Sequence, residues 1–185
     1  MGDDGGVAKK RGLETVRDMV FSLGVVGIVV VVLLVLGRHS EQDPVKPIDY
    51  SVKFQQASQV APYPLLAPQG LPERWRATSA EYDPDDPAAT TWHIGFINPD
   101  QQYAAVEQGN GPSDPFVAEK GFDGKPVGSV DVAGEQWRSY DGPKYRSLVR
   151  VKDGVTTMVT GTATFEDLAR LAAALRPSAA PVPAS

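Results

Sequence analysis

Residues 145–161 read YRSLVRVKDGVTTMVTG, two runs rich in apolar and β-branched residues joined by Asp153-Gly154. Asp-Gly between two such runs favours a tight type I′ turn, because both central positions of that turn require a positive φ. The stretch therefore predicts a β-hairpin with strands at 145–152 and 155–161. A single hairpin cannot bury a face by itself, so the segments on either side must complete the fold.

The segments before this hairpin carry further strand signals. Short apolar or alternating runs are separated by turns rich in proline, glycine and aspartate. A short helix is expected at 114–120, with Ser113 as its N-cap. Together these patterns predict a meandering antiparallel sheet of about six to eight strands. The strand signals lie at 50–54, 75–82, 92–98, 103–108, 127–132 and 136–140, and a short apolar piece lies at 65–67.

A longer helix is expected after the hairpin. Thr164, followed by Asp167, has the spacing of a weak capping box. Arg170 and Arg176 are then expected late in the helix, where a cation suits the dipole, and Pro177 would end it. The fold class is therefore α+β, with a C-terminal amphipathic helix packed on one face of the sheet. The apolar stripe recurs at i, i+3, i+4 and i+7 and consists of Leu168, Leu171, Ala172 and Leu175.

An uncharged apolar run extends from Met19 to Gly37 and reads MVFSLGVVGIVVVVLLVLG. A helix of this length is about 28 Å long, close to the thickness of the hydrocarbon core of a bilayer. The run has no polar stripe and no small-x-small cleavage site after it. We therefore expect an uncleaved transmembrane helix rather than a core helix or a signal peptide. Basic residues are more frequent before the run than after it, which favours a cytoplasmic N-terminus and an extracytoplasmic C-terminal part.

The apolar run implies five regions along the chain. The linker is polar and contains two prolines, and the C-terminal tail is rich in proline and lacks periodicity. The predicted regions are a cytoplasmic tail at 1–18, a transmembrane helix at 19–37, a juxtamembrane linker at 38–47, an extracytoplasmic α+β domain at 48–176 and a disordered tail at 177–185.

Charge and cysteine content restrict the function. The formal net charge is −5, and the N-terminal tail has equal numbers of basic and acidic residues, so the excess acid lies in the outer domain. An acidic domain argues against a nucleic-acid partner. The chain has no cysteine, which excludes thiol chemistry and disulfides. For a small extracytoplasmic domain, this fits a bacterial cell envelope better than animal secretion.

The candidate catalytic residue is His93, on the opposite face of its predicted strand from Trp92, Ile94 and Phe96. No serine-hydrolase or zinc-protease motif surrounds it, so the favoured interpretation is a half-buried strand histidine. The alternative is an envelope hydrolase or transferase that uses His93 with a nearby acid. We predict no catalytic residue, cofactor site or metal site, and hence no enzyme.

A candidate binding patch lies on the final hairpin. Arg146, Arg150 and Lys152 share one face of the strand at 145–152, and Arg138 is expected to point the same way from the preceding strand. Such a row could bind an anion or the acidic edge of a partner. A solvated strand face is the alternative.

Four segments together form a recognisable pattern. They are APQGLPERW at 67–75, WHIGF at 92–96, QYAAVEQ at 102–108 and TGTA at 160–163, the last followed by a Leu/Ala helix. With the N-terminal apolar run, the set resembles an actinobacterial single-pass membrane family, domain of unknown function 4245. The resemblance implies a cell-envelope location and no assigned activity. The resulting prediction is a membrane-tethered, non-enzymatic module that binds an envelope protein or peptide. Its oligomeric state is left open.

Overall fold

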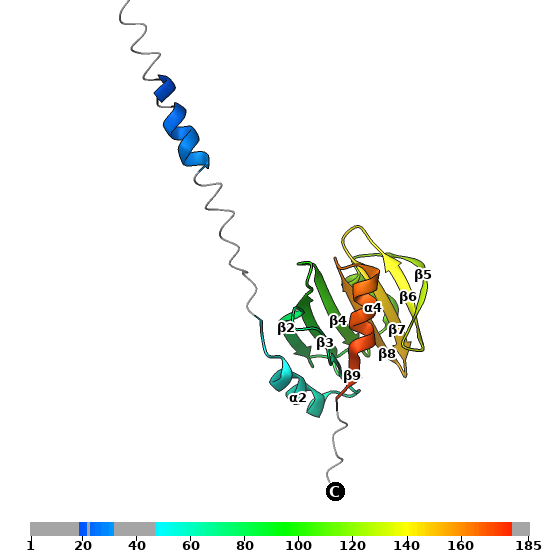
Figure 1. The fold of residues 1–185 in the computed structure, drawn as a ribbon. Helices are drawn as coiled ribbons and strands as arrows, with labels where there is room; N and C mark the ends of the chain where they lie inside the picture. The colour runs from blue at the N-terminus through cyan, green and yellow to red at the C-terminus, as the bar shows by residue number, and fades with distance from the viewer. Residues whose placement is uncertain (1–18, 22, 32–46, 179–185) are drawn as a thin grey trace, which may run out of the picture. The chain divides into compact units, whose positions relative to one another are not determined.

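The main sheet of the domain contains seven antiparallel strands. The computed structural model describes residues 19–21, 23–31 and 47–178, and the last of these ranges holds the sheet, in the order β2-β3-β4-β8-β7-β6-β5 (Figure 1). Two meanders, β2–β4 and β5–β8, join where β4 pairs with β8. The predicted antiparallel α+β class is confirmed, although the sheet is not one continuous meander. The strands are β2 Arg76–Asp83, β3 Thr91–Ile97, β4 Tyr103–Gly109, β5 Lys125–Val132, β6 Glu135–Asp141, β7 Arg146–Lys152 and β8 Val155–Gly161.

The predicted Asp-Gly hairpin is confirmed as β7 and β8. Asp153 and Gly154 both have positive φ, 52° and 76°, as the tight turn requires. β4 and β8 lie at the centre of the sheet and are buried along all but their first residues. Gly161, at the end of β8, has to be glycine because a Cβ there would collide with the carbonyl oxygen of Tyr103.

Three helices and a small second sheet cover the domain. The helix α4 lies across one face of the sheet (Figure 1) and packs on β7 and β8. Leu168 and Leu171 on its inner side are fully buried, and Thr164 caps it by accepting a hydrogen bond from the Asp167 amide, as predicted. The elements are α2 Ser51–Val60, α3 Ser113–Lys120, α4 Phe165–Ala174 and the antiparallel pair β1 Leu66–Pro68 and β9 Leu175–Pro177.

The predicted strand at 50–54 is wrong, because Tyr50 is the N-cap of α2 and the following residues form its first turn. The alternation in YSVKF is shorter than the helical segment that contains it, and the Gln and Ala residues that follow are good helix formers. Asp49 accepts a hydrogen bond from the Ser51 amide at the start of the helix. Phe54 then packs on Trp92, with ring centroids 5.8 Å apart.

Two further boundaries are corrected. α4 ends at Ala174, and Leu175–Pro177 form β9, which pairs with β1, so Arg176 lies outside the helix. Ser113 is the first residue of α3 rather than its N-cap, a position held by Pro112. Pro177 and Ser178, at the start of the predicted disordered tail, still pair with the β1 region.

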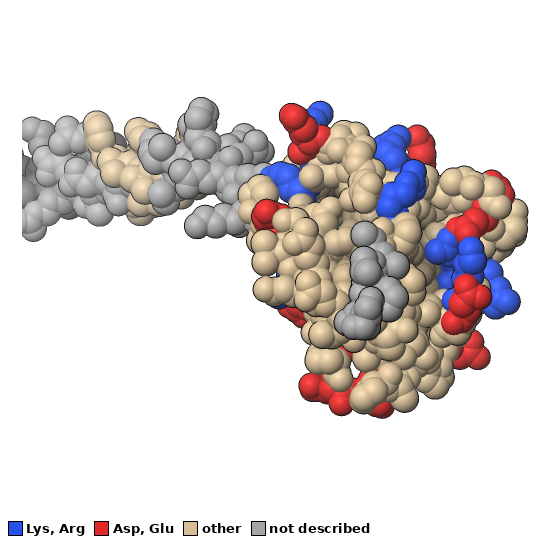
Figure 2. All heavy atoms as spheres, turned by 90° about the horizontal axis from the view of Figure 1, so that it is seen from below, with Lys and Arg blue, Asp and Glu red and all other residues tan. Residues whose placement is uncertain are grey.

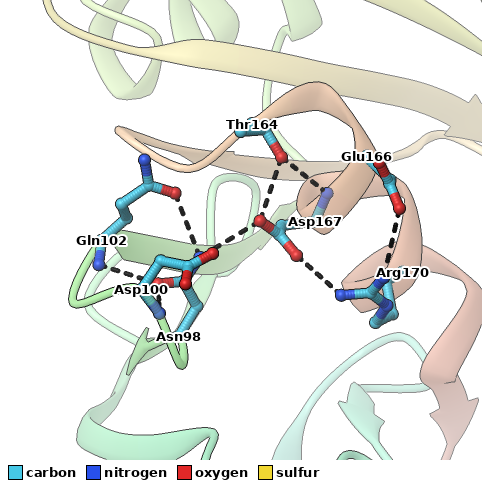
Figure 3. A network of polar contacts seen from close by, with 7 residues as sticks. All are labelled: Asn98, Asp100, Gln102, Thr164, Glu166, Asp167 and Arg170. Carbon is cyan, nitrogen blue, oxygen red and sulfur yellow. Dashed lines mark hydrogen bonds and ion pairs between the residues drawn. The ribbon is translucent and has the colours of Figure 1, made fainter.

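A polar network fastens the β3–β4 turn to the start of α4 (Figure 3). Asn98 is fully buried and donates through Nδ2 to Gln102 at 3.1 Å and to Asp167 at 3.2 Å. Its Oδ1 accepts the backbone amides of Asp100 and Gln102. Asp167 also accepts from Thr164 and Arg170. Each of these polar side chains therefore has partners where it is shielded from water.

The N-terminal unit is described only in part. Residues 19–21 and 23–31 are helical, and their large apolar side chains are exposed. The remaining positions of the predicted span, 22 and 32–37, lie outside the described residues, as do 1–18, 38–46 and 179–185. None of the helices in the described ranges is both long enough and apolar enough to cross a membrane.

Candidate functional site

A hydrogen-bonded row crosses three adjacent strands on the sheet face opposite α4. His93 on β3 lies directly opposite Glu107 on β4, and Nδ1 of the histidine is 2.7 Å from Oε1 of the glutamate. On the other side, Nε2 of His93 is 2.8 Å from Oγ of Ser79 on β2. An ionised carboxylate only accepts hydrogen bonds, so Glu107 places a proton on Nδ1. In neutral His93, Nε2 is then free to accept the hydrogen bond of the Ser79 hydroxyl.

A bulge and a glycine make room for this row. The pairing of β2 with β3 shifts register between Ala77 and Ser79, so Thr78 lies in a β-bulge. Ser79 is paired with Gly95, and a Cβ built on Gly95 would be 2.5 Å from the Ser79 Oγ and 3.3 Å from Nε2 of His93. The serine hydroxyl and the histidine ring therefore occupy the space that a side chain at position 95 would fill.

The row is only partly open to solvent. The Glu107 side chain is 8% exposed and that of His93 is 22% exposed. Both residues line a cavity of about 850 Å³ that also includes Tyr82, Lys53 and Lys120. Ser79 lies outside this lining, half-buried on the bulged edge strand β2. A buried acid, a half-buried imidazole and a hydroxyl in this order resemble the arrangement that activates a nucleophilic serine.

A second candidate site is a cleft of about 420 Å³ beside the C-terminal end of α4, on the opposite face of the sheet. Its walls come from β1, β4, β5, β6, β7, β8, α4 and β9. The walls combine apolar groups with three cations and two acids. The apolar lining includes Leu66, Val132, Trp137, Val155, Ala172 and Leu175, and the charged lining consists of Arg150, Lys152, Arg176, Glu135 and Asp153.

Arg150 is the central cation of this cleft. Its guanidinium lies over the Trp137 ring, 4.9 Å from the ring centroid, and forms an ion pair with Glu135. Lys152 binds the same glutamate at 3.2 Å. Burial lowers the pKa of Arg150 from its ordinary value, and its Nε is buried without a hydrogen-bond partner. The guanidinium thus keeps one donor unused in a partly dehydrated setting.

The four predicted patch residues do not form one row. Arg150 and Lys152 line the cleft together, but Arg138 pairs with Val149 and therefore lies on the opposite face of the sheet. The expectation that Arg138 points the same way is wrong, because directly paired residues share a face. Arg146 lies 3.9 Å from Asp141, at the far end of β7. On the face in Figure 2, basic and acidic side chains are interleaved rather than separated into a field of one sign.

The fold and these sites define a small antiparallel α+β domain with a polar row on one sheet face and a cleft on the other. The family model described as "Protein of unknown function (DUF4245)" matches residues 11–175, and the chain belongs to this family. No curated protein matches the chain.

Two solved structures are similar to part of the chain. One is the complex structure of Pseudomonas aeruginosa MucA/MucB, with a TM-score of 0.37, and the other is the crystal structure of MucB in complex with MucA(peri), with a TM-score of 0.38. Each is 16% identical and covers 62% of this chain. The matches cover 35% and 37% of those chains, so this chain spans little more than a third of their length.

Proposed function

We propose that this protein is a membrane-tethered binding module of a bacterial cell envelope, with its α+β domain on the extracytoplasmic side and an envelope protein or peptide as its partner. The family is of unknown function, so the proposal rests on the chain itself. In this proposal the run at 19–37 is the tether and the cleft beside α4 is the binding surface.

The apolar run supports the tether. In its described part, residues 19–21 and 23–31 are helical, and their exposed side chains include Phe21, Leu23 and Ile28. Leaving such side chains in water is unfavourable by about 25 cal/mol for each Å² of apolar surface, whereas lipid hydrocarbon accommodates them. The bias of basic residues toward the N-terminal side supports an inside N-terminus.

The cleft beside α4 is the main structural support for the proposed binding role. It is a concave surface beside α4, and its volume of about 420 Å³ lies within the range of ligand pockets. Arg150 and Lys152 share a single acid, Glu135, which leaves the local charge positive in a domain with an excess of acidic residues. A partner that presents an acidic side chain beside apolar ones would complement this surface.

Site-specific photo-cross-linking in native membranes tests the proposal. A photoreactive residue at Val155 faces the cleft, and one at Val151, near the same hairpin turn, faces the opposite side of the sheet. We expect a discrete adduct from position 155 and none from position 151. Arg150→Gln with Lys152→Gln should remove that adduct, whereas Arg138→Gln on the other face should leave it.

Equal adducts from both positions, or no adduct from position 155, would contradict a binding role for the cleft. An adduct that survives the double substitution would show that these cations do not recognise the partner.

A further inference from the structure

We propose that Ser79, His93 and Glu107 form a nucleophilic serine site that hydrolyses carboxylic esters. This activity goes beyond the proposed binding function and uses the opposite face of the sheet. Its failure would leave the binding proposal intact, and the reverse also holds.

The order of the contacts is the order that serine activation needs. Oγ of Ser79 is 2.8 Å from Nε2 of His93, and Nδ1 of the same ring is 2.7 Å from Glu107. The buried glutamate holds the imidazole in one tautomer and stabilises its protonated form, while Nε2 accepts the serine proton. Glu107 is therefore a positioning residue, and Ser79 and His93 are the residues that would touch substrate.

The chemical step balances with water as the only co-reactant. Ser79 Oγ attacks the ester carbonyl carbon, its proton passes to His93 Nε2, and the alcohol leaves with that proton. Water then attacks the acyl-serine, giving one proton to His93. The carboxylic acid is released, and the proton returns from His93 to Ser79. The net reaction converts an ester and water into an acid and an alcohol.

The bulge supplies a donor beside the nucleophile. A Cβ built on Gly95 would be 3.1 Å from Oγ1 of Thr78, so this hydroxyl lies on the same face as the row. In the part of the chain that the structure describes, the Thr78 hydroxyl has no hydrogen-bond partner. It is therefore available to donate to the oxygen that becomes negative during attack, a role that side-chain hydroxyls can fill.

The cavity next to the row gives substrate a place to lie. It has about 850 Å³, and His93 and Glu107 form part of its wall. Tyr82 lines it together with the lysines Lys53 and Lys120. A small uncharged ester therefore has space beside the imidazole, in a cavity whose wall also includes the acids Glu81, Asp83 and Asp85.

Reaction of the full-length protein in detergent with a fluorophosphonate probe tests this site. We expect one covalent adduct, located on Ser79 by peptide mass spectrometry, and slow hydrolysis of 4-nitrophenyl acetate. Ser79→Ala should abolish both, and Ser129→Ala, on the exposed strand β5, should change neither. Glu107→Gln should lower the labelling rate about tenfold or more, because it removes the carboxylate that orients His93, and a correctly positioned general base contributes about 10²–10⁴-fold.

A merely structural role for the row would give a different result. The imidazole of His93 takes the serine proton in the proposed step, so His93→Gln should lower the labelling rate of Ser79 at least tenfold while circular dichroism shows an intact fold. Absence of a Ser79 adduct, or equal labelling rates for the wild type and Glu107→Gln, would overturn the proposal.

Discussion

Two tyrosines with raised pKa values make the stability of the fold depend on pH in the alkaline range. Tyr63 is 8% exposed and donates its hydroxyl to the Thr90 carbonyl at 3.1 Å. Burial raises the pKa of Tyr63 to about 12, and burial together with the charge of Glu107 raises the pKa of Tyr103. A phenol whose pKa is higher in the folded state stabilises the fold below its unfolded pKa of about 10. That stabilisation is lost as the pH rises through the folded-state value.

Tyr63→Phe is expected to change the pH dependence of stability. Loss of the hydrogen bond to Thr90 should lower the free energy of unfolding by about 1 kcal/mol at neutral pH. Between about pH 10 and pH 12 the variant should lose less further stability than the wild type, because it has one fewer buried phenol to ionise. Urea unfolding at both pH values measures this, and an equal loss in the two proteins would contradict the assignment.

The polar row shows which residue contacts can be predicted from sequence. The predicted turn between 92–98 and 103–108 already implies a hairpin, and its register places His93 opposite Glu107. Pairing the residues of the two strands outward from that turn would have identified Glu107 as the nearby acid that the hydrolase or transferase alternative required. Ser79 could not be found in this way, because the bulge at Thr78 shifts the register and a long loop separates β2 from β3. Only the folded sheet brings the serine to the histidine.

Among the elements, α4 depends on contacts at both ends. Its N-terminus is held by the network around Asn98 and Asp167, and its C-terminus leads directly into β9, which pairs with β1. The capping residue and apolar stripe predicted this helix because both are local signals. β9 was missed because a three-residue strand has no periodicity, and only pairing with β1, more than 100 residues earlier, stabilises it.

Asn98→Ala should weaken the attachment of α4 to the β3–β4 turn. The substitution leaves the amides of Asp100 and Gln102 without their side-chain acceptor and removes a donor to Asp167. We expect a loss of about 2–3 kcal/mol in the free energy of unfolding, measured with urea. Asp100→Ala is the matched control, because it keeps the backbone amide that Asn98 accepts. Equal losses in the two variants would contradict a role for the network.

The wrong prediction of a strand at 50–54, like the missed β9, arises because tertiary contacts decide the local structure there. Alternation over five residues at 50–54 indicates a strand, but the same letters also fit the first turns of a helix. Tertiary packing decides between them, since Tyr50 packs edge-on against Phe96 and Phe54 packs against Trp92. A helix covers these core aromatic residues where an extended strand would leave them exposed.

At the scale of the whole molecule, the domain uses the two faces of one sheet differently. The cleft with Arg150 lies on the α4 face, and the row with His93 lies on the other. Binding at one face therefore does not require the chemistry at the other. In the proposed function, the uncharged run at 19–37 is the tether, and it belongs to a separate unit of the chain, Met1–Val45.

The central claim, that this run holds the domain outside the membrane, is tested most directly by single-cysteine labelling. The chain has no cysteine, so Ala8→Cys and Ser129→Cys each introduce one unique thiol. A maleimide that cannot cross the membrane should label Ser129→Cys in intact cells and Ala8→Cys only after permeabilisation. Labelling of position 8 in intact cells, or of position 129 only after permeabilisation, would contradict a cytoplasmic N-terminus and an extracytoplasmic domain.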